Sequence, residues 1–399
     1  MAKESTLKPS FSKLNLNTLI TMEPELKNLL FAIIRSGMEI SDLDLHISEE
    51  ELLKLCIIAK AHSILPILVR GINRSSVQGI KIPQVYEEHF FKDTRRSVLY
   101  ENTIKKIKEI FKDYKIPFIL LKGSILRELY PDVLMRTSCD LDILIHENDM
   151  TKAISVIESG TGFKIYARGY HDVAMIDSDL KLELHFSLKE NMTQIDSLLN
   201  RVWEFSMPNE LNYQYTMSLE YQIFYILAHM SYHLTHGGIG IRPLLDLWLL
   251  NHKTTYDKTK LNELIVDAGI SVFYEKCSRL TDAWMSNSTL EPDLLEFEEF
   301  CLSGGVFGDI EKAALSQVRN NSKVKYVYNR LFVSRKYLEE LYPKLKTKPY
   351  LLPLYQIKRW FRLNDRHRRI KAQKEFEVAI SSTRKDKEKI DLLLKSLGF

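Results

Sequence analysis

The feature that most constrains this 399-residue sequence is a short block of β-favouring runs inside a chain with helical periodicity. From residue 23 to about residue 115, apolar residues recur at the spacing of amphipathic helices, and they do so again after Trp203. Between these regions, residues 116–188 alternate short apolar runs with turn residues, a pattern typical of strands. The sequence therefore predicts an α+β protein with a small mixed β-sheet core and helical N-terminal and C-terminal domains.

Local signals predict helices on both sides of this core. Ser48 and Glu51 have the spacing of a capping box ahead of Leu52–Ile67, where Pro66 is expected to break or kink the helix. Residues 83–115 predict one long charged helix, and Ser218–Leu234 predicts an amphipathic one. The predicted domains are an N-terminal helical region (1–92, beginning with a loose tail, 1–21), the α/β core (93–207) and a helical C-terminal domain (208–399).

The core itself is predicted to contain several strands and two short helices. A hairpin turn at Asp177-Ser178-Asp179 is expected to join the last two strands. The expected strands are Ile116–Leu121, Asp140–Ile145, Phe163–Ala167, Asp172–Asp177 and Lys181–Leu188, and the helices are Ile125–Tyr130 and Thr151–Ser159.

Composition narrows the class of protein. With 45% hydrophobic and 27% charged residues, the chain is apolar enough to bury a core and is not generally disordered. A net charge of +4 is far weaker than that of a dedicated nucleic-acid binder. The four cysteines are scattered, and no long apolar segment or signal-peptide h-region occurs. We expect a cytoplasmic protein with no membrane partner.

A Gly–Ser pair lies where a predicted strand ends and a helix begins. Gly123 would let the backbone approach a ligand closely, and the helix N-terminus offers free N–H groups to a phosphate. The Ser124 hydroxyl adds a donor. Taken alone, such a pair carries little weight.

Two acids stand close together on the next predicted strand. Because side chains alternate along a strand, Asp140 and Asp142 share one face, while Leu141 and Ile143 point the other way. Paired carboxylates are suited to Mg²⁺, and divalent ions of this kind can bridge nucleotide phosphates. The alternative is a solvated edge strand with its polar residues outward.

A third carboxylate follows on a later predicted strand. Glu183 alternates with Leu182 and Leu184, so it could complete a metal site or act as a base. Asp177 and Asp179 are alternatives, but both look like turn residues first, which favours Glu183.

Residues 116–145 (IPFILLKGSILRELYPDVLMRTSCDLDILI) resemble the nucleotidyltransferase core of DNA polymerase β-like enzymes. More closely, the chain resembles a largely uncharacterised bacterial nucleotidyltransferase family. The shared pattern is Leu121-Lys122-Gly123, Tyr130-Pro131, Arg136, Asp140-Leu141-Asp142 and Glu183-Leu184-His185, and the likeness extends from about Leu52 to about Leu250.

The resemblance implies roles for individual residues. Gly123 and Ser124 would hold the triphosphate of an NTP, and Lys122 and Arg136 would be further nucleotide-binding residues. Asp140, Asp142 and Glu183 would be catalytic and would bind Mg²⁺, with Mn²⁺ as the second candidate. Better-known superfamily members usually have Asp at the third position, whereas Glu183 reaches one methylene further.

Several histidines are weighed beside this site. His171 and His185 are expected to meet on adjacent strands, as substrate-contacting or supporting groups. The spacing of His229, His233 and His236 places them on one helix face; zinc binding is one interpretation, but contact with a substrate or an interface is favoured. The resembling family has similar histidines on the helix that packs on the core, and the resemblance implies that His233 and His236 face the cleft.

The predicted function is metal-dependent transfer of a nucleoside monophosphate from an NTP to a hydroxyl or phosphate, with release of pyrophosphate. The acceptor is open: a small molecule, a sugar, a protein or an RNA end. Residues 356–375 carry eight Lys/Arg against two acids, which keeps RNA among the candidates, although a solvated helix face is the simpler explanation. The alternative is a non-catalytic nucleotide- or partner-binding regulatory protein on the same fold.

Overall fold

The fold is taken from a computed structural model of the whole chain. The structure describes residues 22–42, 46–75, 81–138, 140–169, 171–209, 213–306, 308–318, 323–342, 344–361 and 366–399. The tail predicted at 1–21, Cys139 and part of the basic segment 356–375 lie outside these residues.

The N-terminal region is helical, as predicted. Its helices are α1 (Pro24–Gly37), α2 (Glu49–Ala61), α3 (Leu65–Arg74) and α4 (Gln84–Asp113). The capping box at Ser48 and Glu51 is present, with each residue bonding the backbone of the other. Pro66 does not kink a continuous helix: α2 has already ended, and Pro66 occupies the first turn of α3, where its missing N–H costs no hydrogen bond.

Seven strands form one mixed sheet. They are β1 (Phe118–Leu120), β2 (Leu141–Ile145), β3 (Lys164–Arg168), β4 (Asp172–Asp177), β5 (Leu180–His185), β6 (Ser206–Pro208) and β7 (Gln214–Met217). Their order across the sheet is β3-β4-β5-β2-β1-β7-β6. β2 is antiparallel to β1 but parallel to β5, and β7 is parallel to β1. The predicted α+β class with a mixed-sheet core is confirmed.

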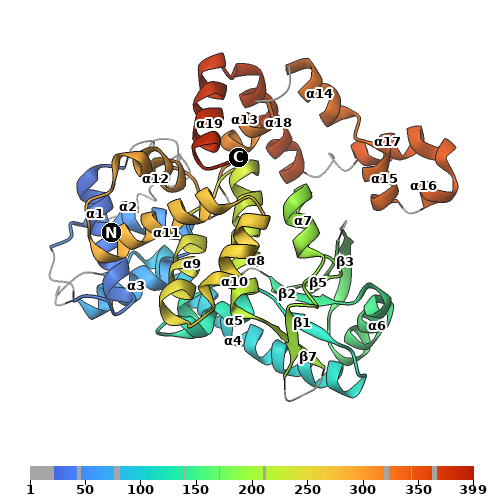
Figure 1. Cartoon of the computed structure of the whole chain (residues 1–399), viewed down its shortest axis with the longest axis horizontal. Helices are drawn as coiled ribbons and strands as arrows, with labels where there is room; N and C mark the ends of the chain where they lie inside the picture. The colour runs from blue at the N-terminus through green and yellow to red at the C-terminus, as the bar shows by residue number, and fades with distance from the viewer. Residues whose placement is uncertain are drawn as a thin grey trace, which may run out of the picture.

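Each face of the sheet packs against helices. On one face, α4 and α6 (Met150–Gly160) bury a cluster that includes Phe111, Leu141, Ile143 and Leu182. On the other face, Ile119 and Leu144 join a larger core shared with the N-terminal and C-terminal helices. Figure 1 shows α4 and α6 on the side of the sheet away from those helices.

Short elements link the strands at the edge where acids gather. α5 (Gly123–Leu126) follows β1 and continues as a 3₁₀ turn at Arg127–Leu129, while α7 (Thr193–Leu199) follows β5. The predicted hairpin between β4 and β5 is present, with Ser178 in the left-handed conformation at φ 51°.

The remaining helices complete the large core. α8 follows β7 directly, with the Ser218 hydroxyl capping its first turn, and its buried residues run almost continuously from Tyr221 to Ala228. Within the described residues, none of the helices has the length and apolar character needed to span a bilayer. The C-terminal helices are α8 (Leu219–His236), α9 (Ile241–Lys253), α10 (Lys258–Asp267), α11 (Ser271–Ser286), α12 (Leu295–Leu302), α13 (Ile310–Val318), α14 (Lys323–Leu331), α15 (Arg335–Leu341), α16 (Lys344–Thr347), α17 (Leu352–Trp360), α18 (Arg366–Ser381) and α19 (Arg384–Ser396).

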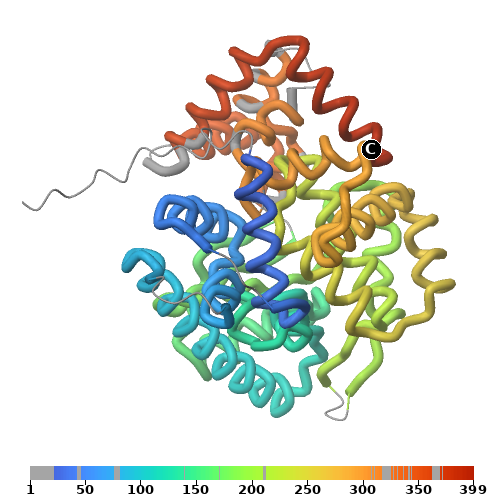
Figure 2. Tube along the Cα trace, turned by 90° about the vertical axis from the view of Figure 1, so that its left-hand side faces the viewer, coloured from blue at the N-terminus to red at the C-terminus, as the bar shows by residue number. Residues whose placement is uncertain are grey.

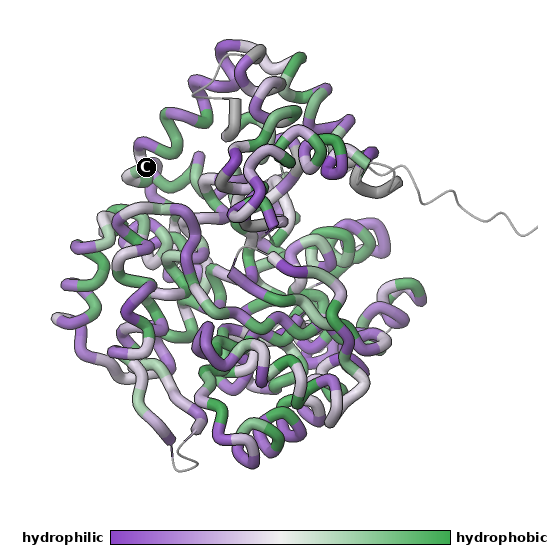
Figure 3. The backbone as a smooth tube through the Cα atoms, turned by 90° about the vertical axis from the view of Figure 1, so that its right-hand side faces the viewer, coloured by the Kyte–Doolittle hydropathy of each residue, from purple (hydrophilic) through white to green (hydrophobic). Residues whose placement is uncertain are grey.

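The views from either side show how these parts are assembled. In Figure 2 the N-terminal helices lie along one flank, with the C-terminal helices in orange and red across the top. The hydropathy colouring in Figure 3 shows alternating apolar and polar stretches along most outer helices, as expected for amphipathic helices on a shared core. The sheet extends to Met217, and the division into domains at 92 and 207 stays a prediction.

Candidate active site

Alternation along β2 and β5 sends their acids to the same side of the sheet. Leu141 and Ile143 are buried against α4 and α6, so Asp142 between them points to the opposite face, toward α8. β5 repeats this pattern and is parallel to β2, which places Glu183 directly beside Asp142 in the register of the two strands. The predicted proximity of the two acids therefore follows from the strand pairing.

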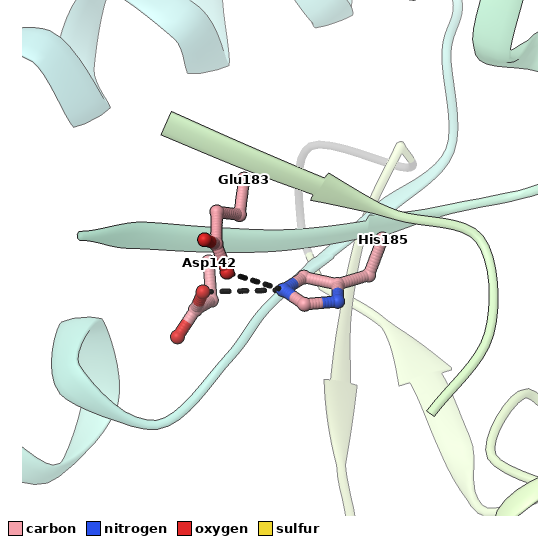
Figure 4. Close-up of side chains that lie close together, drawn as sticks. All are labelled: Asp142, Glu183 and His185. Atoms are coloured by element: carbon pink, nitrogen blue, oxygen red, sulfur yellow. Dashed lines mark hydrogen bonds and ion pairs between the residues drawn. The ribbon is translucent and has the colours of Figure 1, made fainter. Parts of the chain in front are cut away.

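His185 joins these acids from the next outward position of β5. Its Nε2 lies 3.1 Å from Asp142 Oδ1 and 3.6 Å from Glu183 Oε2. Figure 4 shows the three side chains converging, with the imidazole directed at both carboxylates. One ligand atom from each residue lies within 4.8 Å of the others, and no other such group of three His, Cys, Asp or Glu occurs among the described residues.

Asp140 precedes β2 and lines the same cavity as these three residues. Burial, followed by the charges of Asp142 and Glu183, raises the pKa of Asp140 to about 6. Burial also opposes ionisation of Asp142, but the hydrogen bond from His185 and the charge of Lys122 lower its pKa overall. The cavity thus brings three carboxylates together, and one of them, Glu183, is also ion-paired with Lys181.

The donor set fits a divalent cation. Carboxylate oxygens are the ligands that Mg²⁺ and Mn²⁺ prefer, and an imidazole nitrogen is also accepted by Mn²⁺. Asp142, Glu183 and His185 are close enough to share one ion, and Asp140 contributes charge from the same cavity.

A sharp turn from β1 into α5 forms the neighbouring wall. Lys122 adopts a positive φ of 34°, a strained conformation for a residue with a side chain. At Gly123, a Cβ would lie 2.3 Å from Ser138 Oγ and 2.9 Å from Arg136 Nη1. Only glycine therefore allows these groups to approach the turn so closely.

Arg136 is anchored by a buried ion pair. Its Nε and Nη2 each donate to an Asp246 carboxylate oxygen of α9 at 2.8 Å, and Tyr130 Oη donates to the same carboxylate at 2.8 Å. The remaining Nη1 donates to Ser138 Oγ at 3.2 Å. Arg136 thus ties the loop before β2 to α9 and sets the position of Ser138.

The wall formed by α8 carries a chain of hydrogen-bonding groups. His229 Nδ1 lies 2.8 Å from Glu190 Oε1, and His229 Nε2 lies 2.8 Å from His233 Nε2. Lys122 Nζ is 3.1 Å from both nitrogens of the His229 ring. Burial, followed by the charge of Lys122, holds the pKa of His229 well below its ordinary value, so this imidazole is neutral.

These walls enclose a cavity of about 420 Å³. Asp140, Asp142 and Glu183 line it from the sheet, and His229 and His233 line it from α8. This volume is within the range of small-ligand pockets, and its polar lining suits a charged ligand.

Residues 48–286 match the family described as an uncharacterised nucleotidyltransferase family. The chain belongs to this family. Every residue that lines the cavity falls within the matched range. No match to a curated protein or to a solved structure was found.

In this member of the family, most of the predicted site residues meet at the cavity. Lys122, Gly123, Arg136, Asp140, Asp142, His171, Glu183, His185 and His233 all line it. The expected meeting of two histidines is also observed: the rings of His171 and His185 stack with centroids 5.7 Å apart.

Two predicted residues lie elsewhere. Ser124 is not part of the cavity lining, and its backbone N–H is used within the turn, donating to Leu121 O. His236 is at the exposed end of α8, where its ring stacks on Tyr232. Within the described residues, His229, His233 and His236 do not belong to a group of side chains that could share a metal ion.

Sequence reasoning missed some of the residues that line the cavity. Ser138, Glu190 and Tyr225 reach the cavity, yet none has a motif that distinguishes it. Glu190 is an isolated acid after a strand, and only the docking of α8 onto the sheet brings it to His229. The family pattern before Asp140 could have drawn attention to Ser138, since it follows Arg136 by two residues.

Proposed function

We propose that the protein transfers a nucleoside monophosphate from an NTP to a hydroxyl or phosphate oxygen of an acceptor. The acceptor oxygen forms a bond to the α-phosphorus, the bond from that phosphorus to the bridging oxygen of the β-phosphate breaks, and pyrophosphate leaves. Family membership supports the general reaction class. The observation that carries the proposal for this chain is the register pairing of Asp142 with Glu183 in the cavity shared with Asp140 and Gly123.

In this proposal the acids form the metal-binding wall. Asp140, Asp142 and Glu183 would hold Mg²⁺ or Mn²⁺, and His185 orients Asp142 through its hydrogen bond. The bound ion would neutralise charge on the triphosphate and orient the α-phosphate for in-line attack. Glu183 accepts the proton of the attacking hydroxyl.

Other residues that line the cavity position the two substrates. Lys122 and Gly123 contact the phosphates, since both line the cavity where a cation and a close backbone approach are available. Arg136 acts by holding Ser138 in place, because its own charge is engaged by Asp246. His171 and His233 face the space left for the acceptor, which is a small molecule, a sugar, a protein or an RNA end.

The test is turnover of NTPs labelled at the α-phosphate, with Mg²⁺ or Mn²⁺ and a panel of acceptors from these classes. Pyrophosphate release with transfer of label is expected, and Asp140→Ala/Asp142→Ala is expected to reduce it at least about a hundredfold. Asp179→Ala, in the exposed hairpin turn, is the matched control and should keep full activity. Equal turnover by the double variant and the wild type would refute the proposal, and NTP binding without turnover would favour the regulatory alternative.

A further inference from the structure

Positive charge is concentrated in one stretch outside the range matched by the family. Residues 323–360 contain ten Lys or Arg and only two Asp or Glu. The whole chain carries only +4, so the rest of the protein is net negative. A small overall charge therefore conceals a strongly basic region, and such asymmetry is typical of contact with a polyanion.

This region forms a lobe of its own. α14, α15, α16 and α17 project from the body of the molecule at the upper right of Figure 1, away from the sheet and the candidate active site. Its exposed cations include Lys325, Lys344, Lys346, Lys348 and Lys358. A ligand could contact several of them without entering the cavity of the active site.

An open groove with aromatic walls runs between α14 and α17. It has a volume of about 680 Å³ and is lined by Tyr328, Phe332, Ile357 and Trp360 among others. The Tyr328 side chain is 61% exposed and that of Trp360 36% exposed. Trp360 Nε1 donates to Leu331 O, and the ring of Trp360 meets that of Phe332 edge-on, with the ring centroids 5.7 Å apart. These contacts fix the two rings, which stay partly exposed to solvent.

Rings and cations together indicate the chemistry of the ligand. Fixed, exposed aromatic rings offer faces on which nucleobases stack, and the Lys side chains exposed elsewhere on the same lobe suit the phosphates that link those bases. A duplex hides its base faces, so only a single strand could use both features. An apolar protein partner would use the rings but would have no need for such an excess of positive charge.

We propose that the lobe formed by α14–α17 binds single-stranded polynucleotide, with bases in the aromatic groove and phosphates along the exposed lysines of the same lobe. The binding surface is separate from the carboxylates of the cavity and does not depend on the proposed catalysis. Asp142→Asn is therefore expected to bind a polynucleotide like the wild type.

The experiment measures binding of the full-length protein to fluorescein-labelled oligouridylate and oligothymidylate by anisotropy, beside an RNA hairpin of equal charge. Strands of about twenty nucleotides exceed the usual site size of one such surface. Single strands should bind more tightly than the hairpin, and the two single strands show whether RNA or DNA is preferred. With five phosphate contacts, the affinity should fall on the order of a hundredfold between roughly 50 and 200 mM salt.

Two variants separate stacking from charge. Tyr328→Ala/Trp360→Ala should weaken single-strand binding at least about fivefold. Lys346→Gln/Lys348→Gln/Lys358→Gln should reduce the slope of log affinity against log salt by about 2. The lysine changes are confined to exposed side chains, so they test the proposal even if the aromatic variant folds poorly.

Matched changes on α4 serve as controls. Phe91→Ala removes an exposed ring there, and Lys105→Gln/Lys106→Gln/Lys112→Gln removes three exposed charges; neither should alter binding. Absence of binding at low salt, equal affinity for hairpin and single strands, or unchanged binding by both lobe variants would overturn the proposal. Binding to anionic vesicles or to a protein without binding to either oligonucleotide would overturn it as well.

Discussion

The buried ion pair between Arg136 and Asp246 allows a quantitative test of how the active-site loop is held. The two side chains are only 6% and 4% exposed, and two parallel hydrogen bonds of 2.8 Å join them. Asp246→Asn removes the negative charge while keeping the shape of the side chain. Arg136 would then be a buried cation without its ionic partner, and Tyr130 would lose a charged acceptor.

The expected cost follows from this geometry. Removing one member of a buried pair destabilises proteins by about 3–5 kcal/mol, because the remaining charge stays buried without compensation. Replacing both members by apolar residues of similar size is often close to neutral. Asp246→Asn should therefore lower the free energy of unfolding by about 3–5 kcal/mol, whereas Arg136→Met/Asp246→Leu should recover most of that loss.

Urea denaturation of the wild type, Asp246→Asn and the double variant, followed by circular dichroism, measures these differences. The loop argument adds a second readout: because Arg136 Nη1 holds Ser138 beside Gly123, the double variant should be stable but weak in nucleotide binding. A cost below about 1 kcal/mol for Asp246→Asn, as seen for exposed pairs, would refute the reasoning. Equal losses in the single and double variants would refute it too.

Three further predictions address the metal, the turn and pH. Asp142→Asn should weaken Mn²⁺ binding at least about tenfold, as measured by electron paramagnetic resonance of the free Mn²⁺. The control is Asp113→Asn, at the exposed end of α4. Equal Mn²⁺ affinity of the two variants would contradict the proposed ligand set. Gly123→Ala places a Cβ 2.3 Å from Ser138 Oγ, so nucleotide binding by calorimetry should weaken by about 1–3 kcal/mol, and unchanged binding would show that the close approach is dispensable. Burial lowers the pKa of His62 to about 4 in the folded protein, whereas a histidine of the unfolded chain has a pKa near 6.5. As the pH falls, the unfolded chain is therefore protonated at His62 before the folded protein is. The contribution of His62 to the free energy of unfolding is therefore fully present above about pH 6.5 and falls by about 3 kcal/mol toward pH 4. Thermal unfolding of His62→Gln, measured against pH, should lack this fall. Curves of melting temperature against pH that run parallel for the variant and the wild type would exclude His62 as its source.

Local patterns predicted the parts of the fold that depend on nearby residues. The capping box at Ser48 and the hairpin at Asp177–Asp179 are short-range features, and both are present. β6 and β7 were not predicted, because each is three or four residues long and Pro208 lies in β6. β7 is a strand because it pairs with β1 from nearly a hundred residues earlier, and no local signal records that pairing.

The same distinction applies to the site. The alternation of polar and apolar residues along β2 and β5 is visible in the sequence. It predicts that Asp142 and Glu183 lie on the same face of the sheet, although the register of the two strands is known only from the structure. The partner of Arg136 could not be predicted, since Asp246 is 110 residues away on a helix with no motif of its own. Likewise, the contact between Glu190 and His229 exists only because α8 docks against the sheet.

The direct passage from β7 into α8 has a consequence for how the walls of the cavity are held together. β7 is hydrogen-bonded to β1, and Ser218 joins its end to the first turn of the helix that carries His229 and His233. The carboxylate wall and the histidine wall are thus parts of one continuous scaffold. The junction between them is short, because Ser218 follows the last residue of β7 and accepts a hydrogen bond from the Tyr221 N–H in the first turn of α8. A change in the pairing of β7 with β1 would therefore be passed directly to the helix that carries the histidines of the cavity.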